Sequence, residues 1–224
     1  MVAYFPFNGN ANDTSGNGHD GTVFGATLTE DRFGNPDSAY NFDGDDYIDI
    51  PFSPQIEPDI FSLSLWFNTT NTDNPWFGNT MISTDPDSFG CLHGYEIVVR
   101  DGGRVLFGLD PTSSCGDGNG VSSDDLLSDG AWHHVVAIYD SSLKLYIDGN
   151  LQSDIVNDAL YPKTNVSIRI GMTRNRNNDN RFFLGSIDDF RIYNRVLSDD
   201  EIQELFNGSL GVRTHLLKSH LIGV

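Results

Sequence analysis

Residues 61–68 read FSLSLWFN, a stretch in which large apolar side chains recur at every second position. Successive side chains of an extended strand point to opposite faces, so this spacing predicts a β-strand with one apolar face. Trp66 lies on the opposite face, with Ser62 and Ser64. The apolar face is formed by Phe61, Leu63, Leu65 and Phe67. Such a half-buried strand is typical of an antiparallel sheet that covers a hydrophobic core.

The same two-residue period recurs along most of the chain, between clusters of Gly, Asp, Asn and Pro that are typical of turns. The segments DSS (140–142) and DGN (148–150) predict tight hairpin turns. We therefore expect an all-β fold, a sandwich of antiparallel sheets. Further strands are predicted at residues 38–42, 46–50, 94–100, 104–109, 132–139, 143–148, 165–171 and 182–193.

One short helix is predicted near the C-terminus, in the segment LSDDEIQELFNG (197–208). Ser198 is placed to cap its first turn, and Glu201 three residues later completes a capping box. Leu197 and Ile202 occupy the positions of a hydrophobic staple across this cap. Gly208 is expected to end the helix, because glycine readily adopts the left-handed conformation found there.

The composition limits the number of domains and the classes of partner. The 224 residues, of which 38% are hydrophobic, suffice for one all-β domain with a single core. The 13 basic and 32 acidic residues give a net charge of −19, which repels nucleic acid and anionic lipid surfaces. No apolar run approaches the length of a membrane span, so we expect no membrane insertion.

The two ends of the chain lead to separate predictions. Met1 is followed directly by the strand-like segment VAYFPF (2–7), so we expect that any export signal has been removed. Residues 211–224 contain no acidic residue and break the character of the chain. We therefore expect one domain over residues 1–210, followed by a tail or linker outside the fold, native or introduced by cloning.

Cys91 and Cys115 are the two cysteines of the chain, and each stands beside a glycine in a polar, loop-like segment. Buried unreactive thiols usually lie in apolar strands, so these settings favour a disulfide and an oxidising compartment. Loop closure would give such a bridge a stabilisation of about 3 kcal/mol. Two free thiols in a reduced protein are the alternative.

Several motifs occur in an order that resembles one known family. They are VAYFPFNGNANDTSGNGHDGTVFGATL (2–28), AYNFDGDDYIDIP (39–51), FSLSLWFN, DGAWHHVVAIYDSSLKLYIDGN (129–150) and GSIDDFRIYNRVLSDDEIQEL (185–205). Over residues 2–207 the chain resembles the laminin G-like jelly-roll domains of the concanavalin A-like lectin and glucanase superfamily. The resemblance implies a jelly roll of two curved antiparallel sheets, with ligands held on or beside the concave face.

The resemblance also implies a structural calcium ion that ties the first strand to the last. It gives Asp13 and Asp188 as carboxylate ligands, with backbone carbonyl groups of Asn8, His19 or Gly44 beside them. Calcium takes six to eight oxygen ligands, and the turn-rich segment around Asp13 exposes carbonyl groups. In the alternative, Asp13 caps an Asx-turn and Asp188 is a solvated strand residue.

No catalytic residues are predicted. Glycan hydrolases of the superfamily carry closely spaced carboxylates on one strand, which retaining hydrolysis requires. Glu96 is the nearest candidate, but Val98 stands at the next position on its face. The resemblance gives Trp132 and one of the two histidines, His133 or His134, a structural part at a strand start, in packing or hydrogen bonding. We therefore expect that the protein is not an enzyme.

Candidate ligand contacts come from aromatic and arginine side chains, because sugar sites combine aromatic platforms with polar groups for the hydroxyls. As alternatives, the tryptophans pack beneath or within loops and the arginines balance nearby acids. The candidates are Trp66, Trp76, Arg174, Arg176 and Arg181.

These observations favour a non-catalytic, lectin-like module of a secreted or cell-surface protein, stabilised by calcium and binding a glycan or polysaccharide. A protein-binding adhesion domain that recognises a receptor is the second hypothesis. A glycan hydrolase or lyase is the third. The identity of the sugar does not follow from the sequence.

Overall fold

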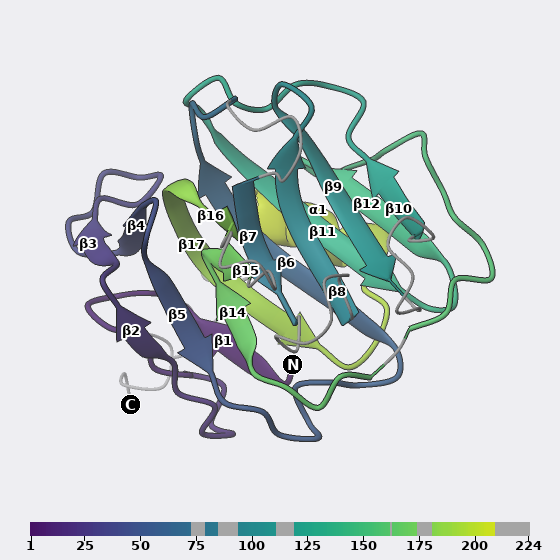
Figure 1. Cartoon of the computed structure of the whole chain (residues 1–224), viewed down its shortest axis with the longest axis horizontal. Coiled ribbons are helices and arrows are strands. Elements are labelled where there is room, and N and C mark those ends of the chain that lie inside the picture. The colour runs from purple at the N-terminus through teal and green to yellow at the C-terminus, as the bar shows by residue number, and fades with distance from the viewer. Residues whose placement is uncertain (73–78, 85–93, 111–118, 162, 174–180, 209–224) are drawn as a thin grey trace, which may run out of the picture.

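Two large antiparallel sheets form the fold of the protein. The structure is a computed structural model, and it describes residues 1–72, 79–84, 94–110, 119–161, 163–173 and 181–208. The sheets lie face to face, and Figure 1 shows the helix α1 behind their strands. The prediction of an all-β sandwich with one short helix is confirmed for these residues. The tail predicted at 211–224 lies outside them and stays a prediction.

The eight-stranded sheet, here called sheet A, has the order β13-β12-β11-β6-β17-β4-β3, with β1 paired to β17. The last strand of the described residues, β17, therefore lies between the two earlier strands β6 and β4. The bounds are β1 Ala3–Phe5, β3 Thr27–Thr29, β4 Ala39–Asp43, β6 Phe61–Asn68, β11 Trp132–Tyr139, β12 Leu143–Ile147, β13 Asn150–Leu151 and β17 Leu184–Tyr193.

The seven-stranded sheet, here called sheet B, has the order β10-β9-β8-β7-β14-β5-β2. A small ribbon of β15 Met172–Thr173 and β16 Arg181–Phe182 adjoins it at β7. The bounds in sheet B are β2 Thr22–Phe24, β5 Tyr47–Ile50, β7 Asn79–Ser83, β8 Gly94–Arg100, β9 Arg104–Asp110, β10 Asn119–Ser122 and β14 Ile168–Ile170.

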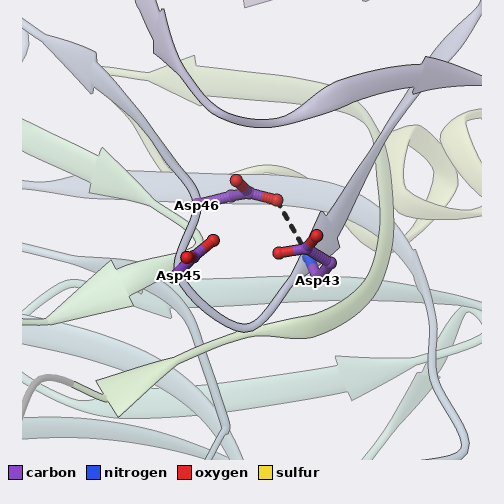
Figure 2. A group of neighbouring side chains, drawn as sticks. All are labelled: Asp43, Asp45 and Asp46. Carbon is purple, nitrogen blue, oxygen red and sulfur yellow. Dashed lines mark hydrogen bonds between the residues drawn. The ribbon is translucent and has the colours of Figure 1, made fainter.

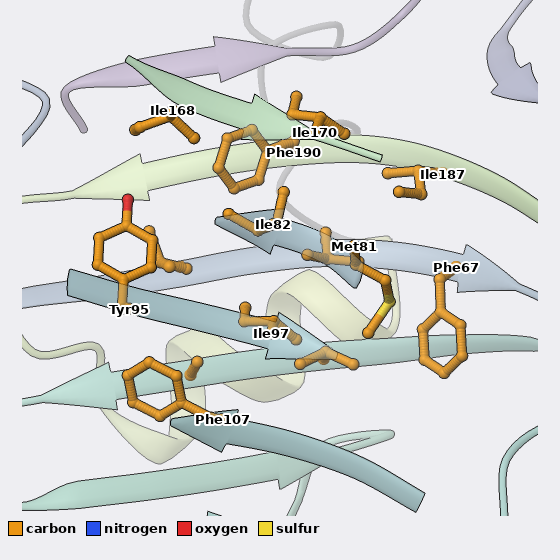
Figure 3. Packing of buried hydrophobic residues seen from close by; sticks show 14 of the residues in the cluster. Phe67, Met81, Ile82, Tyr95, Ile97, Phe107, Ile168, Ile170, Ile187 and Phe190 are labelled. Atoms are coloured by element: carbon orange, nitrogen blue, oxygen red, sulfur yellow. The ribbon is translucent and has the colours of Figure 1, made fainter. Parts of the chain in front are cut away.

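The core fills the space between the two sheets with the apolar faces predicted from alternation. Phe67 and Phe190 of sheet A are fully buried, and Ile97 and Phe107 of sheet B belong to the same core cluster (Figure 3). The apolar stripe of β6 belongs to this cluster, whereas Ser62, Ser64 and Trp66 point to the outer face of sheet A. Burial of such side chains is the main driving force for folding.

The helix α1 (Asp199–Phe206) covers part of the outer face of sheet A. Its capping box forms as predicted, because Ser198 Oγ accepts from the amide of Glu201 and the Glu201 carboxylate accepts from the amide of Ser198. Leu197 and Ile202 are buried together with Val136 of β11. The helix therefore packs on sheet A and not on sheet B.

Candidate functional site

A polar row crosses the outer face of sheet B from one edge to the other. The inward positions of these strands carry Ile48, Ile168 and Ile97, so the alternate positions point outward. Strand register then places one outward residue of each strand in line across the sheet. The row consists of Thr22, Asp49, Arg169, Ser83, Glu96, Gly108 and Gly120.

The accessible end of this row lies on β2, β5 and β14. Phe24 and Tyr47 are paired across β2 and β5, and their rings stack with centroids 4.5 Å apart at 13°. Phe24 is 44% exposed, so this stacked pair forms an aromatic surface open to solvent. Asp49 and Arg169 stand beside it, with Arg169 Nε 3.7 Å from Asp49 Oδ1. An aromatic surface, a carboxylate and a guanidinium therefore converge here.

The middle of the row is buried. Ser83 and Glu96 are 1% and 6% exposed, and the Ser83 hydroxyl donates to Thr173 Oγ1 at 3.0 Å. Thr173 pairs with Arg181 in the β15–β16 ribbon. Arg181, a predicted ligand residue, is thereby placed at the same side of the sandwich as the row, and it is half-buried.

The other predicted ligand residues do not join this site within the described part of the chain. Trp66 is 6% exposed, since Phe206 of α1 stacks on it at 5.8 Å and the guanidinium of Arg32 lies 4.4 Å from its ring centre. This packing leaves the Trp66 ring no open face for a sugar. Trp76, Arg174 and Arg176 lie outside the described residues, as do Cys91 and Cys115, so those predictions remain open.

Asp13, the first predicted calcium ligand, is surrounded by hydrogen-bond donors. Its Oδ1 accepts from the amides of Tyr4 at 3.0 Å and Ser15 at 2.8 Å. Its Oδ2 accepts from the Ser15 hydroxyl at 2.9 Å and the His19 amide at 3.1 Å. Although burial raises it, these bonds hold the pKa of Asp13 below its ordinary value. The carboxylate thus organises the turn that follows β1, as the Asx-turn alternative describes.

Asp188, the second predicted ligand, is paired with an arginine. Its Oδ2 lies 2.7 Å from Arg32 Nη1, and the adjacent Asp189 Oδ2 lies 2.8 Å from Arg32 Nη2. Burial and then the Asp189 carboxylate raise the pKa of Asp188, and the nearby guanidinium of Arg32 opposes this rise. Both carboxylate oxygens of Asp13 already accept hydrogen bonds, and the Asp188 carboxylate already pairs with the Arg32 cation. These two carboxylates as placed therefore do not fit a shared calcium ion.

The three residues whose carbonyl groups were predicted as calcium ligands, Asn8, His19 and Gly44, differ in their environments. Asn8 is exposed, and His19 is buried with its Nδ1 3.5 Å from Ser53 Oγ. Gly44 lies in the turn of Asp43, Asp45 and Asp46, whose carboxylate oxygens approach within 4.8 Å of one another (Figure 2). In this turn the Asp43 amide donates to Asp46 Oδ2 at 2.9 Å. An acidic turn of this kind is common without an ion and does not by itself define a metal site.

Both histidines of β11 make side-chain hydrogen bonds within the fold, where a structural part was predicted for one of them. His134 is fully buried, and its Nε2 lies 2.9 Å from Ser64 Oγ beneath α1. A serine–histidine pair of this length can serve in nucleophilic catalysis, but both residues are 0% exposed and unreachable by substrate. Burial also lowers the pKa of His134 to about 3, so the ring stays neutral.

His133 is expected to make folding stability depend on pH. Its Nδ1 lies 2.8 Å from Asp148 Oδ2 and its Nε2 3.1 Å from Asp129 Oδ1, and the Asp148 bond does most to raise its pKa. A raised pKa contributes stability that is complete below the ordinary pKa, about 6.5, and is lost as pH rises through the folded value. Between pH 6 and pH 9 the melting temperature of the wild type should therefore fall more steeply than that of His133→Gln. Parallel curves for the two proteins would contradict this.

Residues 42–203, more than half of the chain, match the family model described as the concanavalin A-like lectin/glucanases superfamily. The chain belongs to this superfamily. Rat usherin (Rattus norvegicus) is 29% identical over 161 residues, which cover 67% of this chain and 3% of usherin. The helix of the described residues is too short to cross a membrane.

Solved structures of other proteins have a similar fold. One is domain 4 of an extracellular arabinanase from Geobacillus stearothermophilus in complex with arabinotriose. It has a TM-score of 0.71 and 20% identity, with 91% of this chain and 97% of that chain covered. Another, the botulinum neurotoxin serotype D binding domain, has a TM-score of 0.69 and 21% identity, with 92% and 51% covered. The chain thus spans about half of that toxin domain.

Proposed function

We propose that this domain is a non-catalytic module that binds a neutral glycan on the outer face of sheet B. The observation that carries the proposal is the stacked pair Phe24 and Tyr47 beside Asp49 and Arg169. The C–H face of a sugar ring packs on an aromatic surface, while its hydroxyls need acceptors and donors nearby. Asp49 supplies acceptor oxygens and Arg169 supplies N–H donors. The arabinotriose in the arabinanase domain supports a glycan ligand by analogy of fold alone.

The charge of the chain favours a neutral sugar over an acidic one. A net charge of −19 repels sulfated or uronic acid polymers at long range. At the site, the carboxylate of Asp49 lies 3.7 Å from Arg169 Nε and offsets the positive charge that an anionic ligand would need. We also propose that the protein is located outside the cell, where neutral glycans are accessible to it. The extracellular arabinanase with this fold supports that location.

A glycan hydrolase finds less support at this row. Its two carboxylates, on Glu96 and Asp49, are separated by the strands β7 and β14. Three strand spacings amount to roughly 14 Å. Hydrolysis by a carboxylate pair requires about 5–9.5 Å, so these two acids are too far apart to act on one glycosidic bond. A receptor protein remains the alternative ligand, and the binding experiment below distinguishes it.

Loss of the aromatic surface is expected to weaken glycan binding. In calorimetric titrations with neutral oligosaccharides, arabinotriose included, Tyr47→Ala should raise Kd by roughly tenfold, because about 1.5 kcal/mol of ring contact is lost. Arg169→Gln should weaken binding similarly by removing charged donors. Phe33→Ala is the matched control, since Phe33 is a 69% exposed aromatic residue that lies outside the row.

The result that would overturn the proposal is specific. The proposal that sheet B is the binding face would be wrong if no neutral glycan on an array bound the protein. It would also be wrong if Tyr47→Ala and Phe33→Ala lost equal affinity. Binding of a protein receptor that is unaffected by Tyr47→Ala would instead favour the adhesion hypothesis.

A further inference from the structure

Arg32 occupies the junction of first and last strands, where the sequence resemblance placed a calcium ion. Its guanidinium forms two ion pairs, at 2.7 Å with Asp188 and 2.8 Å with Asp189. It also lies between two aromatic rings, 4.5 Å from the centre of Phe33 and 4.4 Å from that of Trp66. The Arg32 side chain is only 10% exposed, so its charge acts within a largely desolvated environment.

The network extends from this arginine to the first strand. Asp189 Oδ1 accepts from the Tyr4 hydroxyl at 2.6 Å and lies 3.0 Å from Arg191 Nη2. The guanidinium of Arg191 in turn lies 4.1 Å from the centre of the Tyr4 ring. Side chains from β1, β6, β17 and the segment after β3 thereby meet in one network.

A bulge in β17 makes this arrangement possible. The register between β17 and β6 shifts between Asp188 and Arg191, and Asp189 has a φ of 55°. In a regular strand two successive side chains would point to opposite faces, but the extra residue breaks that alternation. Both carboxylates can therefore pair with the same guanidinium.

We infer that Arg32 supplies the positive charge that the resemblance assigns to calcium, and that the junction of β1 with β17 is held without a metal ion. Arg32 and Arg191 bring two positive charges to the carboxylates of Asp188 and Asp189. A divalent cation placed at the same carboxylates would be repelled by both guanidiniums. This inference is independent of the glycan site on sheet B.

The test compares melting temperatures in millimolar EDTA and in millimolar CaCl2. Arg32→Gln should lower the melting temperature by roughly 10 °C in both solutions, because it leaves two buried carboxylates short of a cation. Arg100→Gln is the matched control, since Arg100 pairs with Asp101 at the surface with side chains 43% and 55% exposed. It should change the melting temperature by no more than about 1 °C.

Measurements on the wild type and on Asp188→Asn do not depend on whether Arg32→Gln folds. For each of these two proteins, the melting temperature in EDTA should equal its melting temperature in CaCl2. The inference is overturned if calcium stabilises the wild type and Asp188→Asn abolishes that stabilisation. It is also overturned if Arg32→Gln melts within about 1 °C of Arg100→Gln, which is the shift expected for a surface ion pair.

Discussion

Replacing Phe61 by alanine should lower the free energy of unfolding by about 4 kcal/mol, the loss typical of a large buried aromatic side chain. Phe61 is 1% exposed and contacts the rings of Tyr95, Tyr139 and Tyr161 at centroid distances of 5.1, 5.5 and 5.3 Å. These rings come from both sheets and a connecting segment, so no single neighbour can move to fill the cavity.

Urea denaturation at constant m-value measures this loss. Phe52→Ala is the matched control, because the same atoms are removed from a residue that is 36% exposed. We expect the control to lose about 1 kcal/mol. Similar losses in the two variants would show that the aromatic cluster around Phe61 is not a centre of stability.

Gly171→Ala should cost about 4 kcal/mol, because the new methyl group meets both backbone strain and a steric clash. Gly171 has a φ of +88°, and a Cβ there would lie 2.4 Å from Phe42 Cδ1 and 3.2 Å from the Asp46 carbonyl oxygen. Phe42 is 1% exposed and stands in the core, so it has little room to yield.

Gly34→Ala separates the two contributions. Gly34 has a similar φ of +80°, and nothing lies within 4 Å of its added Cβ. We expect a loss of about 1 kcal/mol from backbone strain alone. Thermal unfolding of both variants measures the difference, and equal losses would show that the packing against Phe42 relaxes freely.

The strands with an apolar residue at every second position could be predicted from the sequence with accurate bounds. Residues 61–68, 94–100 and 132–139 were each expected as strands and are strands over the same residues. Their alternation records the position of the core directly. In contrast, β7 (Asn79–Ser83) has only five residues and carries a bulge, so it shows no two-residue period. β2 and β3 have three residues each, which is too short for a pattern.

The candidate site depended on information that no local pattern carries. Alternation placed Trp66 correctly on the outer face, but not the helix α1 that covers it. Asp49 and Arg169 are neighbours only because β5 and β14 pair, and that register is set by the whole sheet. The part played by Asp189 could not be predicted from the sequence, because the orientation of its side chain depends on a bulge. Phe24 carried no local signal either, because its strand β2 has only three residues.

Because β17 lies in the middle of sheet A, this domain cannot complete its fold early during synthesis on the ribosome. A nascent chain that lacks residues 184–193 leaves β6 and β4 with unpaired edges and β1 without its partner. Open strand edges of this kind pair readily with other chains. The sandwich can therefore close only after nearly all of its residues have been synthesised. Chains that stop before β17 should aggregate instead of forming a smaller stable domain.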